Sequence, residues 1–426
     1  MARELEVWFF AERVGTLALI GGRLSFCYAP DWLARPEPVS LSNALPLQST
    51  PFDDHRTRPF FAGLLPEGQL RRLIARQFQV SNQNDFALLD HIGGECAGAV
   101  TLLEPGQSLP RPERGNDVRW LSDEEVVATL DELPQRPMLA GKEGLRLSLA
   151  GAQDKLPVVF DGARIGLPVD GTPSSHILKP EIRTLAHTVV NEGFCLALAE
   201  AMQLKPARSQ IYTVMGRRFL LVERYDRLTD AQSLRQRLHQ EDFCQALGVM
   251  PEMKYQNEGG PDLVQCFDLV RRVTRPSAPQ ILRLFDYVIF NTLIGNHDAH
   301  AKNFSLLYAG KSAVLAPLYD VLSTAIYPTL TPKLAMKIGS KYKFSEVQAR
   351  HWDQFAEAVG LGRAQARKRI LALARSMPSK AHELQSDPKR GFTGEGVVEQ
   401  IVGLIEQRCG LTIRRLGAPV ADRDAG

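Results

Sequence analysis

Residues 296–303 read Asn-His-Asp-Ala-His-Ala-Lys-Asn, and a further aspartate, Asp320, follows in the stretch Leu-Tyr-Asp-Val. Within the polar stretch, Asp298 and Asn303 stand five positions apart. Phosphoryl transfer to a hydroxyl needs a carboxylate that accepts the proton of that hydroxyl, and it needs hard oxygen ligands for Mg²⁺. Asp298 is of the type that can act as the base, and Asn303 and Asp320 are of the types that can ligate the metal ion.

The two histidines of the same stretch allow a different chemistry. His297 and His300, together with the two aspartates, form a ligand set that a transition metal would accept, as in a metal-dependent hydrolase. That interpretation leaves two other features without a role, namely a loop of small residues at 148–155 and Lys179 at the end of an apolar run. Phosphoryl transfer uses both of them.

The elements expected around this stretch have the order that phosphoryl transfer requires. The sequence ILRLFDYVIFNTLIGN (281–296) predicts a core helix that Gly295 ends. Its apolar face consists of Ile281, Leu284, Phe285, Val288 and Ile289. The following FSLLYAGKSAVLAP predicts a hairpin, which presents Asp320 after its second strand. Helix, Asp-x4-Asn loop, hairpin and aspartate is the layout of a protein-kinase catalytic centre.

The upstream half supplies the parts that would hold a nucleotide. SLAGAQDK (148–155) predicts a small-residue loop that covers phosphates, although it lacks a GxGxxG pattern. Lys179, in HILKP, is expected on a strand, and Glu192 is expected to hold it from a helix over 188–202. RRFLLVERYDR (217–227) reads as a strand that runs into polar residues, and residues 223–225 at that point are expected to meet adenine through their main chain.

With these pieces in order, the sequence resembles the HipA-type serine/threonine kinases, which are toxins of bacterial type II toxin–antitoxin pairs. The matching pieces run from about residue 60 to 325 and are FFAGLLPEG, IGGECAGAVTL, SLAGAQDK, HILKP, VERYDR, HQEDFCQALG, LIGNHDAHAKNFSLLY and PLYDVLS. The resemblance implies an α+β, protein-kinase-like fold. It would have a small β-rich N-terminal domain, an N-lobe-like sheet and an all-helical C-terminal lobe.

The resemblance also implies roles for individual residues. Asp298 would be the catalytic base, and Asn303 and Asp320 would hold Mg²⁺. Ser148 would be the serine that the kinase phosphorylates on itself. Lys155 and Glu192 would be supporting residues of the site. Arg224 and Asp226 are expected to form a structural pair, and Asp154 stands where the family often has glutamate. The residues expected to bind ATP are Leu149, Ala150, Gly151, Ala152, Gln153, Asp154, Lys179, Glu223, Arg224, Tyr225, His300, Ala301, Lys302, Asn303, Tyr319 and Asp320.

The partners implied by the resemblance are a helix-turn-helix antitoxin of HipB type, operator DNA bound through that complex, and an aminoacyl-tRNA synthetase as protein substrate. Two other functions stay open, a small-molecule phosphotransferase and a non-catalytic co-repressor that acts on DNA. Residues 358–382 hold six cations and no acid, which indicates either a solvated helix face or a phosphate contact on DNA. These cations are Arg363, Arg367, Lys368, Arg369, Arg375 and Lys380.

The whole chain is consistent with a globular enzyme that has several cores. It has 426 residues, 44% hydrophobic and 23% charged, with a net charge of +3. We expect an N-terminal β-rich domain over 1–105, a linker over 106–118, a nucleotide-binding part over 119–235 and a catalytic part over 236–426. Helical patterns in the last part recur at 346–359, 364–376 and 394–408.

Cysteine usage and the N-terminus bear on the compartment. The six cysteines form no CxxC pair, which is typical of reduced thiols. The first residues, MARELEVWFF, lack the pattern of a signal peptide, and no run approaches the ~20 apolar residues of a membrane helix. We therefore expect a cytoplasmic protein without a membrane partner.

Overall fold

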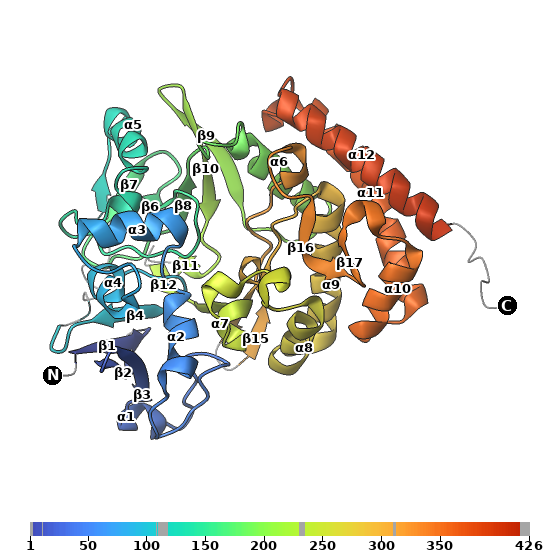
Figure 1. Ribbon diagram of the computed structural model, residues 1–426. Coiled ribbons are helices and arrows are strands. Elements are labelled where there is room, and N and C mark those ends of the chain that lie inside the picture. The colour runs from blue at the N-terminus through green and yellow to red at the C-terminus, as the bar shows by residue number, and fades with distance from the viewer. Residues whose placement is uncertain are drawn as a thin grey trace.

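A computed structural model describes residues 3–10, 12–107, 109, 118–229, 235–309 and 312–417. Figure 1 shows the N-terminal strands at the lower left, a large sheet above them, and the C-terminal helices on the right. None of the helices within these described ranges is long and apolar enough to cross a membrane.

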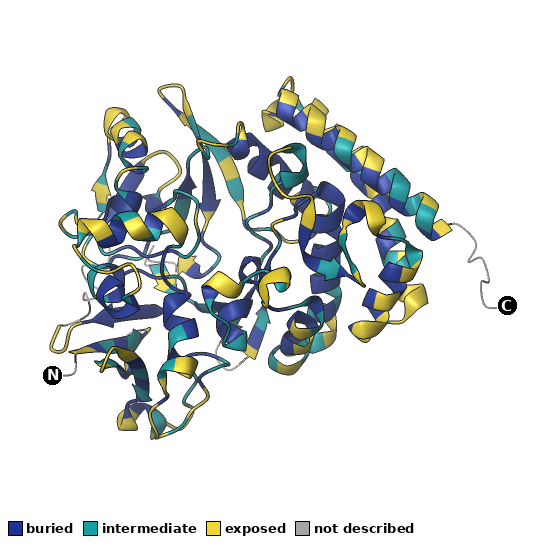
Figure 2. Cartoon of the chain, in the orientation of Figure 1, coloured by how far each residue is buried: buried dark blue, intermediate teal, exposed yellow. Residues whose placement is uncertain are grey.

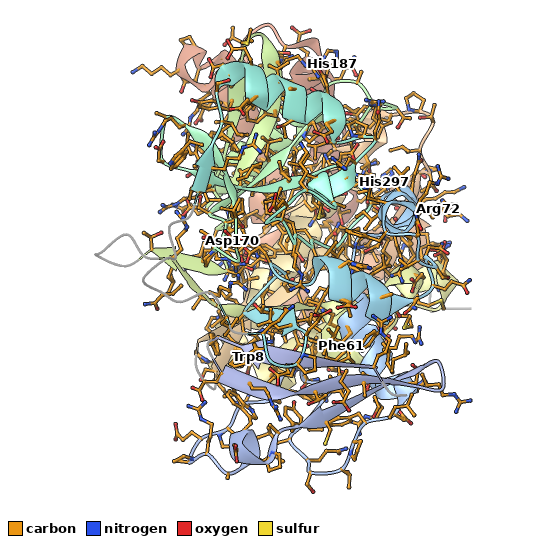
Figure 3. The ribbon with its side chains drawn as sticks, turned by 90° about the vertical axis from the view of Figure 1, so that its left-hand side faces the viewer. Trp8, Phe61, Arg72, Asp170, His187 and His297 are labelled. Atoms are coloured by element: carbon orange, nitrogen blue, oxygen red, sulfur yellow. The ribbon has the colours of Figure 1, made fainter. Side chains whose placement is uncertain are left out.

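The N-terminal part combines a four-stranded antiparallel sheet, in the order β3-β2-β1-β4, with helices that cover it. The alternating burial of Leu5, Val7 and Phe9 along β1 shows that one face of this sheet is core. Figure 3 shows this part from the side, with the strands at the bottom and Phe61 labelled. Its elements are β1 (Arg3–Phe9), β2 (Glu12–Ile20), β3 (Arg23–Tyr28), α1 (Pro30–Leu33), α2 (Asp54–Ala62), α3 (Gly68–Gln77), α4 (Asp85–Ile92) and β4 (Val100–Leu103).

The middle part is a six-stranded antiparallel sheet in the order β5-β7-β6-β8-β10-β9. A turn at Asp161-Gly162 joins β6 to β7, and Gly162 has the positive φ that such a turn favours. The elements are β5 (Val118–Trp120), α5 (Asp123–Glu132), β6 (Leu156–Phe160), β7 (Ile165–Pro168), β8 (His176–Lys179), α6 (Thr188–Ala201), β9 (Ser209–Val214) and β10 (Arg217–Glu223).

The C-terminal part is built around α9, which is buried along most of its length (Figure 2). Its helices are α7 (Phe243–Leu247), α8 (Leu263–Val273), α9 (Ser277–Ile294), α10 (Ala349–Ala358), α11 (Arg363–Ser386) and α12 (Gly396–Gly417). The helix predicted over 364–376 ends too early, because α11 continues through Pro378 to Ser386. A proline usually ends a helix, so the sequence pattern favoured a stop there.

The description of this part as all-helical was incomplete. Just before this part, β11 (Arg227–Thr229) pairs with β12 (Arg235–Arg237). The part itself also contains β13 (His239–Asp242), β14 (Ser305–Ala309), β15 (Ser312–Leu315), β16 (Lys333–Ile338) and β17 (Lys341–Lys343). The strand β13 has only polar residues and therefore no apolar alternation that could predict it. It forms because it pairs with β14, the first strand of the expected hairpin.

Buried apolar side chains form three clusters, one in each part. The helix α6 belongs to the C-terminal cluster, because Val190, Phe194 and Leu198 are buried there and the helix packs against α11 and α12. The other side of α6 lies against β9 and β10. This helix therefore fixes the middle sheet against the C-terminal helices. The division at residues 105, 118 and 235 remains a prediction.

Candidate active site

The loop that carries Asp298 begins where α9 ends. Gly295 has a φ of 79° and ends the helix in the left-handed conformation, as predicted. The carboxamide oxygen of Asn296 accepts a hydrogen bond from Asp298 N at 3.0 Å, and Asn303 Nδ2 donates to Asp298 O at 2.9 Å. At a spacing of five residues, the side chain of Asn303 thus reaches the main chain of Asp298.

The carboxylate of Asp298 is half exposed, with 52% of the side chain accessible. Its Oδ1 accepts a hydrogen bond of 2.5 Å from the hydroxyl of Tyr255. Partial burial raises the pKa of Asp298, and the hydrogen bond from Tyr255 opposes that rise. His300 Nε2 lies 4.0 Å from the same oxygen, but burial lowers the pKa of His300 to about 3, so its ring is neutral at pH 7.

Lys179 connects three elements at the centre of the molecule. It lies at the end of β8, and its Nζ is 2.7 Å from Glu192 Oε1 on α6 and 2.8 Å from Asp320 Oδ1. Burial lowers the pKa of Lys179, but the carboxylates of Asp320 and Glu192 raise it. The net effect is a pKa above the usual value for lysine. The same ion pair keeps the pKa of Asp320 below its usual range. Asp320 has a φ of 56°, a conformation that L-residues seldom adopt.

The loop 148–155 is fastened to the N-terminal part at its first residue and at its middle. Ser148 is fully buried, its hydroxyl donates to Leu64 O at 2.8 Å, and its N–H donates to Glu95 O at 2.9 Å. Further along, Gly151 O accepts a hydrogen bond from Glu67 N at 3.0 Å. At Gly151, φ is 112°, and a Cβ would come 2.6 Å from the ammonium of Lys155. Only glycine therefore fits this position in this loop conformation.

Two further lysines lie in the same region, because the charges of Lys179 and Lys302 both act on Lys155. Lys155 donates to Ala150 O, and burial lowers the pKa of Lys155 to about 8. Lys302 Nζ is buried, 2.7 Å from Asp242 Oδ2 and 3.7 Å from Glu67 Oε1. The main-chain oxygen of Lys302 accepts from Tyr319 OH at 2.7 Å. The site therefore concentrates positive charge that neighbouring carboxylates balance, which suits a ligand with several negative charges.

Two family models cover most of the chain. Residues 5–103 match the HipA N-terminal domain, and residues 147–381 match the HipA-like C-terminal domain. The chain belongs to the HipA family. The family expected from the sequence is thereby confirmed.

Relatives in this family extend over the full fold. The Sinorhizobium fredii protein named "Putative kinase Y4mE" is 47% identical over 88% of this chain and 90% of its own length. The Shewanella oneidensis serine/threonine-protein kinase toxin HipA is 29% identical over 84% of this chain and 83% of its own. The solved complex of Shewanella oneidensis HipA, HipB and operator DNA matches with a TM-score of 0.83 and 27% identity, over 97% of each chain. The kinase-like α+β fold is confirmed, and kinase is the enzyme class that these relatives carry.

In this HipA-family chain, the side chains of the expected hinge, residues 223–225, lie in two different environments. Glu223 ends β10 and is exposed, and the ring of Tyr225 lies 5.7 Å from that of Tyr319. The guanidinium of Arg224 instead points into a buried polar network, where it binds both oxygens of Asp226 at 2.9 and 2.7 Å. The expected structural pair of Arg224 and Asp226 is thus confirmed. Any contact of Arg224 with a nucleotide would have to come from its main chain.

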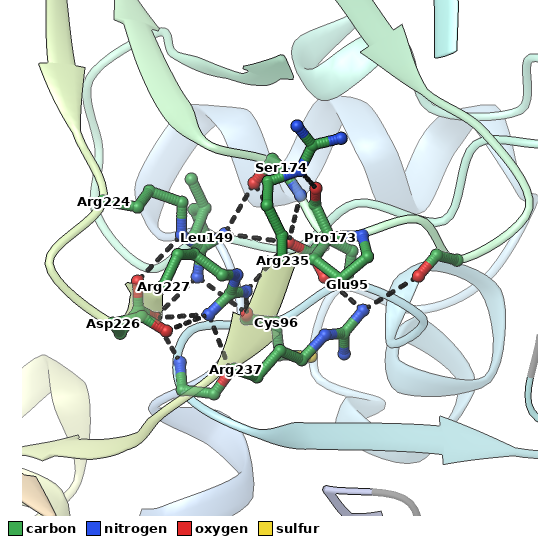
Figure 4. Close-up of polar contacts among 12 residues, drawn as sticks. Glu95, Cys96, Leu149, Pro173, Ser174, Arg224, Asp226, Arg227, Arg235 and Arg237 are labelled. Atoms are coloured by element: carbon green, nitrogen blue, oxygen red, sulfur yellow. Dashed lines mark hydrogen bonds and ion pairs between the residues drawn. The ribbon is translucent and has the colours of Figure 1, made fainter. Parts of the chain in front are cut away.

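That buried network ties the hinge to the N-terminal part (Figure 4). Glu95 accepts from Arg224 Nη1 at 3.1 Å, from Arg227 Nη2 at 2.8 Å and from Ser174 N at 3.1 Å. It also forms an ion pair with Arg237. Since Glu95 O accepts a hydrogen bond from the N–H of Ser148, one residue links Arg224 of the expected hinge to the loop 148–155.

The contacts of His297 disfavour the metal-hydrolase interpretation. His297 Nδ1 lies 3.1 Å from Thr331 O, and its Nε2 lies 2.9 Å from Arg408 Nη2. Both ring nitrogens are therefore engaged, so neither is available as a ligand. Within the described ranges, no group of three His, Cys, Asp or Glu side chains is arranged to hold a metal ion.

Four residues of the site were missed from the sequence, namely Glu67, Asp242, Lys254 and Tyr255. Glu67 and Asp242 stand in LLPEG and HQEDFCQALG, two pieces that carry the family resemblance, so that signal was available. Lys254 Nζ lies 2.8 Å from Glu67 Oε2 and reaches the site from the segment between α7 and α8. No local pattern indicated Lys254 or Tyr255.

Proposed function

We propose that this protein is an ATP- and Mg²⁺-dependent serine/threonine-protein kinase toxin of the HipA–HipB type. It transfers the γ-phosphoryl group of ATP to a serine of another protein and to its own Ser148. The observation that carries the proposal is the position of Lys179 between Glu192 and Asp320, 13 and 141 residues away along the chain. A lysine held by a helix glutamate beside a metal-binding aspartate is the arrangement that kinases need for the phosphates.

The side chains fit magnesium-bound ATP. Asn303 donates its side-chain N–H to Asp298 O, which leaves its Oδ1 free for a hard cation. Asp320 accepts from Lys179 through Oδ1, which leaves its Oδ2 free in the same way. Lys155, Lys179 and Lys302 balance the charge of phosphates. Glycine at 151 lets the loop main chain come close to a ligand.

The residues then act in distinct ways. Asp298 accepts the proton of the acceptor hydroxyl, and Asn303 keeps the Asp298 loop in place. Glu192 orients Lys179 towards the phosphates. When bound, ATP would supply the phosphoryl group, and Mg²⁺ held by Asn303 and Asp320 would balance the charge of the phosphates. The residues proposed to surround the nucleotide are Leu149–Asp154 in the loop, Glu223–Tyr225 at the hinge, and His300, Ala301, Lys302 and Tyr319 near the phosphates.

The buried position of Ser148 supports a self-silencing role. Phosphorylation adds about −1.5 to −2 charges. The pocket that holds the Ser148 hydroxyl against Leu64 O has no exposed surface for that charge. A phosphorylated Ser148 must therefore leave this pocket and take the loop with it. The loop would then no longer cover the nucleotide.

The partners are proposed from the family. The similarity to HipA in its complex with HipB and operator DNA supports a helix-turn-helix antitoxin of HipB type and operator DNA bound through it. An aminoacyl-tRNA synthetase as the protein substrate rests on the family resemblance alone. Three of the six cations on α11 form ion pairs with acids outside this helix: Arg363, Arg367 and Arg369. A fourth, Lys380, pairs with Glu383 on α11 itself. Among the described residues, Lys368 and Arg375 have no such partner, so a phosphate contact from α11 would start with them.

The test is peptide mass spectrometry of the purified full chain after incubation with Mg·ATP. We expect a phosphate on Ser148 in the wild type and none in Asp298→Asn. Asp31→Asn, at an exposed carboxylate outside the site, serves as the matched control and should behave like the wild type. Lys179→Met should lose ATP binding in a direct titration.

The outcomes separate the rival functions. Phosphate on small-molecule acceptors but on no protein would favour a small-molecule phosphotransferase. ATP binding without any phosphate transfer, together with DNA binding in the presence of the antitoxin, would favour a non-catalytic co-repressor. Phosphate on Ser148 in Asp298→Asn would show that Asp298 is not the base.

A further inference from the structure

The segment 250–260, between α7 and α8, reaches the candidate active site and is rigidly built. It contains two short 3-10 helices at Pro251–Met253 and Gln256–Glu258. Tyr255 O accepts the N–H groups of Glu258 at 3.0 Å and of Gly260 at 2.9 Å. A Cβ at Gly260 would come 1.9 Å from Met253 O, so the turn requires glycine there. The main chain of Tyr255 is therefore held from within its own segment.

Side chains on both flanks of Tyr255 fasten the segment to its surroundings. Lys254 Nζ lies 2.8 Å from Glu67 Oε2 of the N-terminal part. The Gln256 Oε1 atom accepts a hydrogen bond of 2.7 Å from Lys337 N on β16. The Tyr255 ring meets the His300 ring edge-on, with centroids 5.1 Å apart. These contacts fix the direction in which the Tyr255 hydroxyl points.

The carboxylate of Asp298 depends on that hydroxyl for its orientation. The hydrogen bonds from Asn296 and Asn303 hold the main chain of Asp298, not its carboxylate. The terminal torsion of an aspartate is soft, and this side chain is 52% exposed. Among the described residues, the hydrogen-bond donor to the carboxylate is Tyr255, through Oδ1. Rotation of the carboxylate would have to break that bond.

We propose that Tyr255 is the positioning residue of the phosphoryl-transfer reaction: its hydroxyl holds Oδ1 of Asp298, so that Oδ2 is presented to the acceptor hydroxyl. The inference rests on the proposed function, in which Asp298 is the base. Burial and the adjacent Asp298 charge raise the pKa of Tyr255, so the phenol stays protonated and acts as a donor. The alternative role for Tyr255 is that of a plug: its phenol would occupy the place of the acceptor hydroxyl beside Asp298 and so slow the reaction.

The test compares Tyr255→Phe with the wild type in the full chain. Transfer onto Ser148 is followed at rising ATP concentration, and the maximal rate is separated from the half-saturating concentration. We expect the maximal rate to fall about 10- to 100-fold, since misplacing a catalytic group has effects of this size. The half-saturating ATP concentration should stay within about 2-fold of the wild type, because Tyr255 does not belong to the proposed nucleotide site. Tyr212→Phe, which removes a hydroxyl that donates to Ala163 O at 2.8 Å outside the site, is the matched control.

Each outcome has a definite meaning. A Tyr255→Phe rate equal to that of Tyr212→Phe would overturn the proposal, and a faster rate would show that Tyr255 is a plug. An inactive wild type would contradict the proposed function instead. In that event crystal structures of wild type and Tyr255→Phe decide the inference, because it requires one ordered Asp298 carboxylate in the first and a rotated or multiple one in the second. An unchanged carboxylate in Tyr255→Phe would refute it.

Discussion

Replacing Glu95 by glutamine tests whether the buried network in Figure 4 holds the three parts of the chain together. The substitution keeps the shape of the side chain and removes one negative charge. The network would then have Asp226 alone against the guanidinium groups of Arg224, Arg227 and Arg237. The new amide also points N–H donors at groups that are themselves donors, so at least one donor loses its acceptor.

The size of the effect follows from the pKa of Glu95. The three arginines lower the pKa of Glu95 from 4.5 to about 2, against the opposing effect of burial. A difference of that size corresponds to about 3 kcal/mol in favour of the charged form. Removal of one partner from a buried ion pair costs about 3–5 kcal/mol in other proteins. We therefore expect Glu95→Gln to lower the free energy of unfolding by about 3 kcal/mol at pH 7.

The pH dependence gives the prediction its sign. The folded pKa lies below that of the unfolded chain, so the stabilisation is present above about pH 4.5 and is lost as the pH falls towards 2. The difference between wild type and Glu95→Gln should therefore shrink to about 1 kcal/mol near pH 3. Urea unfolding of the full chain, followed by circular dichroism at several pH values, measures this difference. The exposed Glu143→Gln is the control. A loss below about 0.5 kcal/mol at pH 7, which is typical of surface substitutions, would refute the reasoning.

Two further predictions concern the junction of the parts and the phosphate loop. Burial raises the pKa of Glu241, which accepts from Asn43 N at 3.0 Å, from 4.5 to about 7. Stability should therefore fall by about 3 kcal/mol between pH 4.5 and 7, and Glu241→Gln should abolish that slope in a thermal-unfolding series. Gly151→Ala should weaken ATP binding about 10-fold or more, because alanine is strained at a φ of 112° and its Cβ meets Lys155 Nζ. Gly403→Ala, on the exposed face of α12 with open space around it, should bind ATP normally; equal affinities for the two variants would contradict the role of Gly151.

Much of the catalytic region could be predicted because its signals are local. The core helix α9, its end at Gly295, the polar loop and the hairpin β14–β15 all follow from apolar periodicity and glycine within short windows. The helix α6 and the strand that ends at Lys179 follow in the same way. The family resemblance then assigned roles to these residues. The polar strand β13 was not predicted, because it has no apolar alternation of its own.

The residue types and spacing of Asp298, Asn303, Asp320 and Lys179 were readable from the chain alone. Packing alone decided that Arg224 turns into a buried network, that both nitrogens of His297 are occupied, and that Tyr255 reaches Asp298. Tyr255 and Asp298 are 43 residues apart, and Glu95 and Arg224 are 129 apart. Apolar periodicity predicts which face of a helix or strand is buried, but it does not predict which side chain, distant in the sequence, makes contact with that face. Such contacts depend on how whole elements pack, so they appear only in the tertiary structure.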